Sequence, residues 1–490
     1  MRKSTTRNVL PLGLICLCFE AILLFSGSGV RARAQQKCHL QPRNQAALQP
    51  PTNTGFGGGT ANSSAPITRT SADPTAGQAT STSLPSPTAF NYGTDKIRGV
   101  NLGGWLVLEP WITPSVFEST GNDNIIDEFT LGQLLDQQTA ETLLKNHWET
   151  WITEDDFAQI QAAGLNHVRI PIGYWSIPLT GSDTSASTST APYISGAWTY
   201  FLQALSWAQK YNIKVIADLH GAPGSQNGFD NSGQRTNNPV WATNPDNVTR
   251  TVDTLTFMAK EVGDQISVME LLNEAAGFRD SNWASVVRNF WTTAYGAVRA
   301  VAGDDMQIMI GDAFLGVESW TNFLTPPQGH GVLMDFHEYQ VFSDLELNRT
   351  FDEHVSWACT NILPPLASYA SSNLWTVSGE WSNAVTDCAK WLNGRGVGAR
   401  WDGTWFPGPG TQVHGSCADF TGNYTTWTQD YIDFLRKYWE VQVEVGEAVQ
   451  GWVFWTWKAE NADEWSYQRG LQGGWIPQDP TDRKFPGICS

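Results

Sequence analysis

The chain has few basic residues for its length. Lysine and arginine together number 30 among 490 residues, against 48 aspartates and glutamates, which gives a formal net charge of −18. Because a phosphate backbone requires a basic face on its partner, this balance argues against nucleic acid as a partner. We expect a soluble protein that acts on something neutral or cationic.

Cysteines in metal-binding spacing are also absent. Two of the seven cysteines lie in an apolar run near the N-terminus, and no remaining pair shows Cys-x-x-Cys or Cys/His spacing. This argues against a zinc site, and we expect no metal and no cofactor. Four cysteines fall in the C-terminal third, as is typical of disulfides in an oxidising compartment, which leaves one unassigned near the N-terminus. The four are Cys359, Cys388, Cys417 and Cys489, and the fifth is Cys38.

Large apolar residues are nearly missing from residues 35–94, which are rich in Ser, Thr, Pro, Gly and Ala. Such a segment cannot bury enough surface to offset its ordering entropy. We therefore predict a disordered, O-glycosylated linker over residues 35–94 and one globular domain over residues 95–490.

Residues 1–34 have the pattern of a signal peptide. Three basic residues precede an apolar run over residues 9–25, which only Glu20 interrupts, and Ala32-Arg33-Ala34 offers a cleavage site. The alternative is an uncleaved signal anchor, which is the one case in which we expect contact with a membrane, although Glu20 is costly there. Both interpretations place the protein outside the cytosol. Four glycosylation sequons agree, at Asn62, Asn247, Asn348 and Asn423.

Two glutamates end strand-like runs about a hundred residues apart. Glu274 closes the apolar run 267–274, and Glu380 lies at the end of 374–381. A buried strand terminus is an expensive place for a carboxylate unless its charge is used. Two such glutamates on different strands suggest an acid and a nucleophile that act on a glycosidic bond. The 24 tryptophans agree, because flat rings stack on the apolar faces of sugars.

Strand-like and helix-like runs alternate along the globular part. The pattern predicts helices over 153–163, capped by Thr153, over 200–211 and over 283–300. Eight strand–helix alternations are typical of a (β/α)8 barrel. The eight predicted strands cover residues 97–105, 167–172, 214–220, 267–274, 307–314, 332–339, 374–381 and 451–457.

Polar and aromatic residues gather at or just beyond the carboxyl ends of these runs, the end at which barrel enzymes carry their function. So many at the same end of the strands argues against chance. They are Glu109, Arg169, His220, Asn273, Glu274, His337, Tyr339, Glu380, Trp455 and Trp457.

Five blocks of sequence resemble the fungal exo-β-1,3-glucanases of glycoside hydrolase family 5, and the likeness extends from about Ile97 to Cys489. The blocks begin Arg98-Gly-Val-Asn-Leu-Gly-Gly-Trp, Asp218-Leu-His-Gly-Ala-Pro-Gly, Phe336-His-Glu-Tyr, Gly379-Glu-Trp-Ser-Asn and Gly451-Trp-Val-Phe-Trp. The resemblance implies a secreted or cell-wall monomer that hydrolyses β-1,3-glucan from chain ends with retention of configuration.

Roles carry over residue by residue. The resemblance implies that Glu274 is the acid/base and Glu380 the nucleophile. Because Glu274 must hold a proton, we expect it in a less polar setting than Glu380. The other residues that the likeness implicates divide into three groups. Arg169 and Tyr339 stabilise Glu380, and Asn273 binds the sugar 2-hydroxyl. His220, His337 and Trp455 surround the attacked glucose, with Trp455 preferred to Trp457 as its floor although strand alternation places both on one face.

The loops set substrate choice in this comparison. Glu109, Asp230 and Asn231 resemble residues that hold the terminal glucose and close the pocket, so that only a chain end fits. Phe229 and Phe342 resemble an aromatic clamp at the entrance. The same likeness implies disulfides Cys388–Cys417 and Cys359–Cys489.

One residue departs from the family pattern. Proline normally follows the acid, and here Ala275 stands there. Proline would fix the backbone, so its loss predicts a looser aim of Glu274. Two alternatives stay open: an endo-acting or transglycosylating β-glucanase on the same barrel, and a non-catalytic glucan-binding protein.

Overall fold

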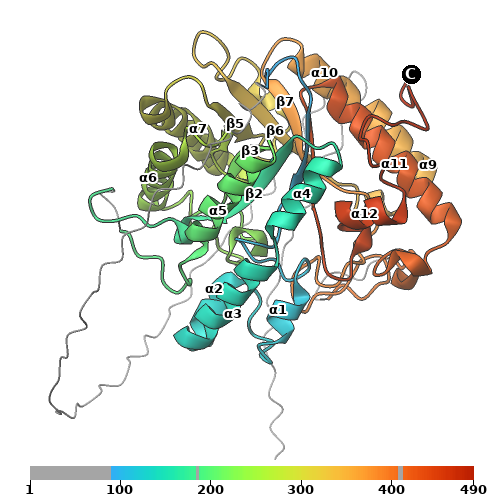
Figure 1. Ribbon diagram of the computed structural model, residues 1–490, viewed down its shortest axis with the longest axis horizontal. Helices are drawn as coiled ribbons and strands as arrows, with labels where there is room; N and C mark the ends of the chain where they lie inside the picture. Colours follow the sequence, from blue (N-terminus) through green and yellow to red (C-terminus); the bar gives the residue numbers. More distant parts are fainter. Residues whose placement is uncertain (1–89, 184–186, 407–411) are drawn as a thin grey trace, which may run out of the picture. The chain divides into compact units, whose positions relative to one another are not determined.

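The barrel occupies most of the chain. A computed structural model describes residues 90–183, 187–406 and 412–490. Eight parallel strands close into a barrel in chain order, each paired with the next and the eighth with the first, as predicted, and helices surround them (Figure 1). The strands are β1 (Ile97–Asn101), β2 (His167–Gly173), β3 (Lys214–Gly221), β4 (Val268–Glu270), β5 (Gln307–Gly311), β6 (Val332–Glu338), β7 (Trp375–Trp381) and β8 (Gly451–Phe454).

The helices begin and end with recognisable caps. Asp280 accepts hydrogen bonds from the backbone N–H groups of Asn282 and Trp283 at the start of the helix Ser281–Ala302. Asp156 accepts one from the backbone N–H of Thr153 at the start of the helix Glu154–Ala162. The three predicted helices are confirmed as α4, α5 and α7. The described helices are α1 (Pro114–Glu118), α2 (Glu128–Leu134), α3 (Gln137–Thr150), α4 (Glu154–Ala162), α5 (Ala197–Lys210), α6 (Pro245–Val262), α7 (Ser281–Ala302), α8 (Asp344–Leu347), α9 (Phe351–Trp357), α10 (Leu363–Ala370), α11 (Gln429–Ala448) and α12 (Tyr467–Gly473).

Four strands are shorter than predicted: β1, β4, β5 and β8 stop three or four residues before the ends of their apolar runs. The chain there leaves the hydrogen-bonded ladder and turns over the rim of the barrel. Glu274, Ala313 and Phe314 have positive φ, which no extended strand allows. Apolar runs predict burial, and these rim segments are buried without being strands.

The barrel interior is layered along its axis. Ile216, Val268 and Leu333 belong to a buried apolar cluster, and the residue two positions later in each strand is acidic: Asp218, Glu270 and Asp335. Because side chains two apart share a face of a strand, the apolar layer lies towards the amino ends and the charged layer above it.

A short segment before β1 packs against the apolar layer. Phe90 and Tyr92 contact it, the Tyr92 hydroxyl lies 3.0 Å from His167 Nε2, and the Phe90 ring lies 4.6 Å from the His167 ring. The packed part of the chain therefore begins no later than Phe90. The predicted signal segment and most of the predicted linker lie outside the described residues.

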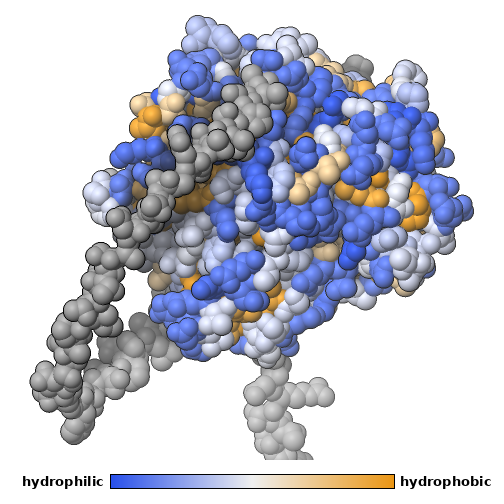
Figure 2. All heavy atoms as spheres, in the orientation of Figure 1, coloured by the Kyte–Doolittle hydropathy of each residue, from blue (hydrophilic) through white to orange (hydrophobic). Residues whose placement is uncertain are grey.

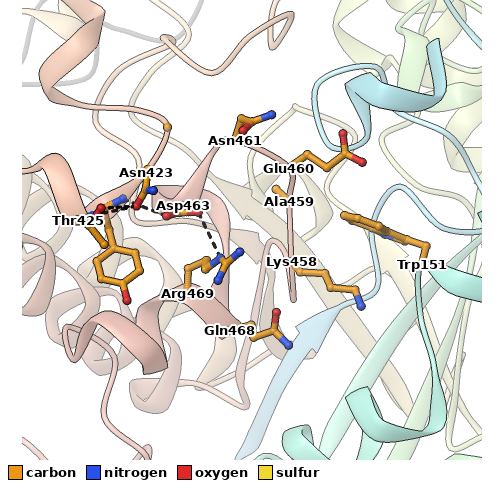
Figure 3. A pocket seen from close by; sticks show the side chains of 12 residues that line it. Trp151, Asn423, Thr425, Lys458, Ala459, Glu460, Asn461, Asp463, Gln468 and Arg469 are labelled. Atoms are coloured by element: carbon orange, nitrogen blue, oxygen red, sulfur yellow. Dashed lines mark hydrogen bonds and ion pairs between the residues drawn. The ribbon is translucent and has the colours of Figure 1, made fainter. Parts of the chain in front are cut away.

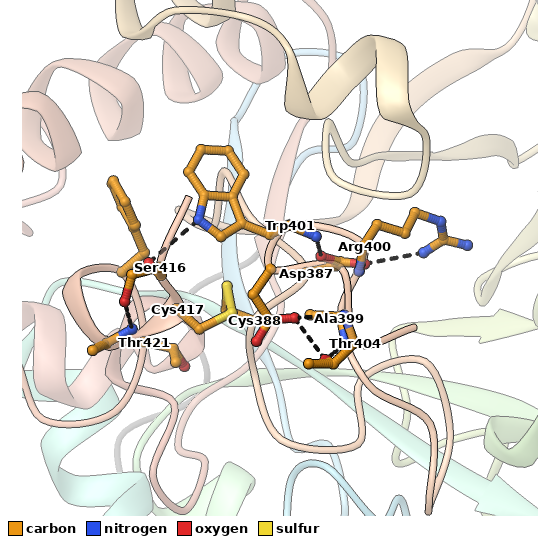
Figure 4. The surroundings of a disulfide bond; sticks show 12 residues. Asp387, Cys388, Ala399, Arg400, Trp401, Thr404, Ser416, Cys417 and Thr421 are labelled. Carbon is orange, nitrogen blue, oxygen red and sulfur yellow. Dashed lines mark hydrogen bonds and ion pairs between the residues drawn. A yellow bond between two sulfur atoms is a disulfide. The ribbon is translucent and has the colours of Figure 1, made fainter. Parts of the chain in front are cut away.

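Both predicted disulfides are present. Cys359–Cys489 joins positions 130 residues apart and Cys388–Cys417 joins positions 29 apart. The second belongs to the long segment after β7, in which Asp387 accepts hydrogen bonds from the backbone N–H groups of Arg400 and Trp401 (Figure 4).

The surface in view is mainly hydrophilic, with hydrophobic residues scattered over it (Figure 2). Among the described residues, no helix combines the length and apolar character that crossing a bilayer requires. Asn348 and Asn423 are exposed, whereas the sequon residue Asn247 is only 8% exposed within α6.

Candidate active site

The structure brings the two predicted catalytic glutamates together at the carboxyl end of the barrel. Glu380 is the penultimate residue of β7, and Glu274 lies four residues beyond β4, not within it. His337 links them, because its Nδ1 is 3.0 Å from Glu274 Oε1 and 3.4 Å from Glu380 Oε2. One oxygen of Glu274 and one of Glu380 lie within 4.8 Å of each other.

Arg169 is the fully buried centre of the charged layer. Its Nη1 donates to Glu380 Oε1 at 2.9 Å, and its Nε donates to Glu270 Oε2 at 2.6 Å. Its Nη2 lies 3.2 Å from Asp218 Oδ2 and donates to Asn273 Oδ1 at 2.8 Å. One guanidinium thereby orients residues of β3, the β4 loop and β7 by charged hydrogen bonds in fixed geometry.

Tyr339 and Arg169 hold opposite oxygens of Glu380. The Tyr339 hydroxyl donates to Oε2 at 2.9 Å, while Arg169 binds Oε1. Burial raises the pKa of Glu380 to about 6, although His337 and Arg169 lower it. Glu380 is thus an oriented carboxylate that ionises fully only above mildly acidic pH.

Glu274 has the more polar setting of the two, contrary to the sequence-based expectation. Burial raises its pKa, but hydrogen bonds and the charge of His337 outweigh burial and bring the pKa below its ordinary value. Asn231 Nδ2 donates to Glu274 Oε2 at 2.8 Å. Two side chains therefore hold this carboxylate without the usual proline, and the looser aim of Glu274 beside the buried Ala275 stays a prediction.

His337 holds the proton that lies nearest to Glu274. Burial lowers the pKa of His337, but Glu380 and Asp335 raise it well above its ordinary value. Asp335 Oδ2 lies 3.1 Å from Nε2, opposite the glutamates. These carboxylates therefore favour the protonated form of the imidazole.

Trp455 and Trp457 occupy different environments. The Trp455 ring stacks on the His220 ring, with a centroid distance of 5.6 Å and an interplanar angle of 10°. Trp457 instead donates its indole N–H to Asp156 of α4 at 2.8 Å. The prediction that both lie on one face is wrong, because β8 ends at Phe454 and strand alternation does not continue past it. The preference for Trp455 agrees with its place beside His220, whose Nδ1 contacts Asp218 at 2.6 Å.

Glu109 and Asp230 form a second acidic group near the glutamate pair. Burial, together with Asp230 and Glu380, raises the pKa of Glu109 well above its ordinary value. Glu109 Oε2 accepts from the Trp111 indole at 2.9 Å. Burial raises the pKa of Asp230 to about 6, and its Oδ2 is buried with no hydrogen-bond partner among the described residues. An unpaired buried acceptor suits a hydroxyl donor of a ligand. Asn231, predicted with these two, donates to Glu274, and its contact with a terminal glucose stays a prediction.

The two predicted entrance phenylalanines lie on separate loops. Phe229 precedes Asp230 after β3, and its ring contacts Phe314 at 6.4 Å. Phe342 follows β6, contacts the Tyr339 ring at 5.6 Å and donates its backbone N–H to Glu346. Both are partly exposed.

Two triads offer oxygen and nitrogen atoms close enough for a metal ion, Glu270 with Asp335 and His337, and Glu274 with His337 and Glu380. Arg169 already pairs with Glu270 and Glu380, and a protonated His337 repels a cation. Side-chain cations of the protein already pair with these carboxylates, so the two triads do not favour a metal ion.

Sequence reasoning missed three members of the charged layer: Asp218, Glu270 and Asp335. A signal was available, because Asp218 precedes His220 and Asp335 precedes His337 by two positions, the spacing of one strand face. Glu270 lacked such a partner within β4, and only Arg169 reveals its role.

A separate cavity of about 500 Å³ lies beside the segment after β8 (Figure 3), and none of the predicted site residues lines it. Its wall carries Trp151 and Lys458, and Lys458 pairs with Asp156 at 2.9 Å. Arg469 in the same wall lies 3.5 Å from Asp463. These charges are satisfied within the protein.

A closed parallel barrel with paired glutamates beyond its fourth strand and on its seventh defines the class of (β/α)8 glycoside hydrolases. The chain belongs to glycosyl hydrolase family 5, since the family model described as cellulase (glycosyl hydrolase family 5) matches residues 135–393.

Curated relatives extend the match. A glucan 1,3-beta-glucosidase of Blumeria graminis is 43% identical over 407 residues, 82% of this chain and 91% of that protein. A glucan 1,3-beta-glucosidase 2 of Wickerhamomyces anomalus is 42% identical, over 82% of this chain and 92% of its own. The crystal structure of a rutinosidase from Aspergillus niger, 18% identical with a TM-score of 0.58, covers 79% of this chain and all of that one, and shows the shared fold.

Proposed function

We propose that the protein is a retaining exo-β-1,3-glucosidase that releases glucose from the non-reducing ends of β-1,3-glucan. The observation that carries the proposal is the glutamate pair, with oxygens of Glu274 and Glu380 within 4.8 Å. Retaining glycosidases place their carboxyl groups about 5–5.5 Å apart, whereas inverting ones need about 6.5–9.5 Å to admit a water. The relatives named glucan 1,3-beta-glucosidase support the choice of substrate.

In the first step, Glu380 attacks the anomeric carbon while Glu274 protonates the leaving oxygen. Arg169 and Tyr339 hold the two oxygens of Glu380, which aims the carboxylate and favours its charged form. The proton for Glu274 is available on His337 Nδ1, 3.0 Å from Oε1. Its transfer gives a neutral acid and a neutral imidazole.

In the second step, Glu274 as a carboxylate removes a proton from water, which attacks the glucosyl ester of Glu380. The low pKa that His337 and Asn231 give Glu274 suits a group that must return to the charged form. Asn231 keeps the carboxylate aimed through both steps, because its hydrogen bond is to Oε2 and the His337 contact is to Oε1.

The exo preference is attributed to Glu109 and Asp230, whose buried oxygens accept hydroxyls of a terminal glucose. Asp230 Oδ2 has no partner among the described residues, so a sugar hydroxyl completes its hydrogen bonding. Trp455 stacks on His220 and presents an apolar floor to the same sugar. We place the enzyme outside the cell, in the medium or the cell wall, in agreement with its disulfides.

Product analysis on laminarin tests the proposal. Glucose as the sole early product, released as the β-anomer, supports it. Early mixed oligomers would assign an endo-acting enzyme instead, and products longer than the substrate would assign a transglycosylase. Parallel digestion of defined β-1,3-, β-1,4- and β-1,6-glucans fixes the linkage.

The nucleophile is tested by Glu380→Gln, which we expect to lower kcat by more than about 10³-fold with an unchanged melting temperature, since the amide cannot form the ester. Asp433→Asn, an exposed acidic residue of α11, is the matched control. Full activity of Glu380→Gln on laminarin would refute the assignment and require another nucleophile.

A further inference from the structure

The loops after β3, β4 and β5 each carry a phenylalanine, and the ring of the β5 loop contacts the other two. Phe229 follows β3, Phe278 lies in the 3-10 turn Gly277–Arg279 after β4, and Phe314 follows β5. The Phe229 and Phe314 rings lie 6.4 Å apart, and the Phe314 and Phe278 rings 5.4 Å apart, both edge to face at 89°. The three rings thus form a continuous row in the order Phe229, Phe314 and Phe278, and Phe229 immediately precedes Asp230 in the chain.

The outer end of this row is exposed. Phe278 is 39% exposed, although it sits on the loop that carries Glu274, only four residues away. Phe229 and Phe314 are partly exposed as well, so the three rings form one contiguous apolar patch, and such patches mark ligand-binding surfaces.

The row is built to be rigid. Ala313 and Phe314 adopt left-handed backbone with φ of 56° and 59°, and Asp312 Oδ1 accepts the Phe314 N–H at 2.9 Å. Gly277 allows the β4 loop to approach closely, because a Cβ there would lie 2.9 Å from the Ala313 carbonyl oxygen. Strained backbone and close loop packing at a surface point to a functional constraint.

We propose that Phe278, supported edge-on by Phe314, is an aromatic platform that binds a glucosyl unit of the substrate beyond the one at Phe229. The inference rests on the proposed function and extends it, because it makes the enzyme favour oligosaccharides long enough to reach the platform. Its occupant is the reducing-side continuation of the same β-1,3-glucan chain, since the row is continuous with the site. The pyranose face stacks on the ring, and Phe314 prevents the ring from tilting away.

The test is kcat/KM for laminaribiose, laminaritriose, laminaritetraose and laminaripentaose. In the unaltered enzyme, kcat/KM rises with length until the platform is filled. In Phe278→Ala, the ratio of kcat/KM for laminaritetraose to that for laminaribiose falls by about tenfold, the effect of uncovering one ring-sized apolar contact. Phe278→Trp keeps or increases the ratio, a rescue that a purely structural role would not give.

Phe485→Ala is the matched control, because Phe485 is about equally exposed at 38% but its backbone N–H donates to Glu440 of α11. Its length dependence should equal that of the unaltered enzyme. An unchanged ratio in Phe278→Ala overturns the platform while the proposed function stands. Failure of the unaltered enzyme to cleave any of the four oligosaccharides overturns the proposed function itself.

Discussion

At the scale of single residues, two cationic side chains of the site each contact several carboxylates. Arg169 and His337 contact five of them, and each catalytic glutamate has a separate donor for each oxygen. Glu380 receives Arg169 and Tyr339, and Glu274 contacts His337 and Asn231. Such paired holding fixes the direction of a carboxylate as well as its charge.

Replacing Tyr339 by Phe should raise the pKa of Glu380 above its value of about 6, because a donor that favours the charged form is lost. Activity requires Glu380 as a carboxylate, so it is present above this pKa and lost below it. The acid limb of kcat/KM therefore moves up by about one pH unit, which corresponds to one charged hydrogen bond of ~1.4 kcal/mol.

A pH profile from 4 to 8 on an aryl β-glucoside measures this shift. Tyr295→Phe is the control, because Tyr295 lies on α7 and its hydroxyl contacts His330 and not a catalytic glutamate. An acid limb that stays in place, or moves down, would contradict the assigned role of Tyr339.

At the scale of elements, the C-terminal segment depends on cross-links to the helices after β6 and β7. Cys359, in the turn after α9, bonds to Cys489, and Glu444 of α11 accepts the N–H groups of Ile488 and Cys489. The segment after α12 has no strand of its own, so these contacts fix it to α11.

Removing a disulfide should cost more when its loop is longer, because the unfolded chain gains more freedom. By loop-closure entropy, Cys359→Ser with Cys489→Ser loses about 5 kcal/mol of unfolding free energy, and Cys388→Ser with Cys417→Ser about 3.5 kcal/mol. Urea unfolding of both double variants measures the difference. A larger loss from the shorter loop would show that native contacts, and not chain entropy, set the order.

The segment before β1 acts as an element of the barrel floor. Tyr92→Ala removes a ring from the apolar layer and a contact with His167, so we expect the unfolding free energy to fall by about 2–3 kcal/mol. Activity at 25 °C should persist, because this end of the barrel is opposite the glutamates. Thr94→Ala, an exposed neighbour, is the control. Calorimetry measures the loss of stability, and an aryl glucoside assay measures the retained activity.

At the scale of the whole molecule, buried carboxyls and a net charge of −18 act in the same direction. Burial raises the pKa of Glu128 to about 7 and that of Glu464 to about 8. These two groups therefore bind more protons in the folded protein than in the unfolded chain between about pH 4.5 and 8, where they are still protonated only in the fold.

Stability should consequently fall as pH rises through this window. The melting temperature is expected to be higher at pH 5 than at pH 8, and self-repulsion of the net charge adds to the fall. Calorimetry across pH 4.5–8.5 measures it, and Glu464→Gln should flatten the slope. A melting temperature that increases towards pH 8 would contradict the argument.

The sequence by itself determined the barrel, the two glutamates at strand ends and the family, because these follow from local patterns, and the resemblance to the family implied both disulfides. Apolar periodicity marks each strand and helix, and the motifs at strand ends are contiguous in the chain. It could not determine where β4 and β8 end, since burial continues past the ladder.

Only the tertiary structure decided which site residues contact one another. It brought Asn231 within hydrogen-bond distance of Glu274, separated Trp457 from Trp455, and made Glu274 the more polar of the two glutamates. Each outcome depends on which side chains from other strands lie within hydrogen-bond distance. The partners are 43 residues apart for Asn231 and Glu274 and 301 apart for Trp457 and Asp156, and only closure of the barrel brings them together.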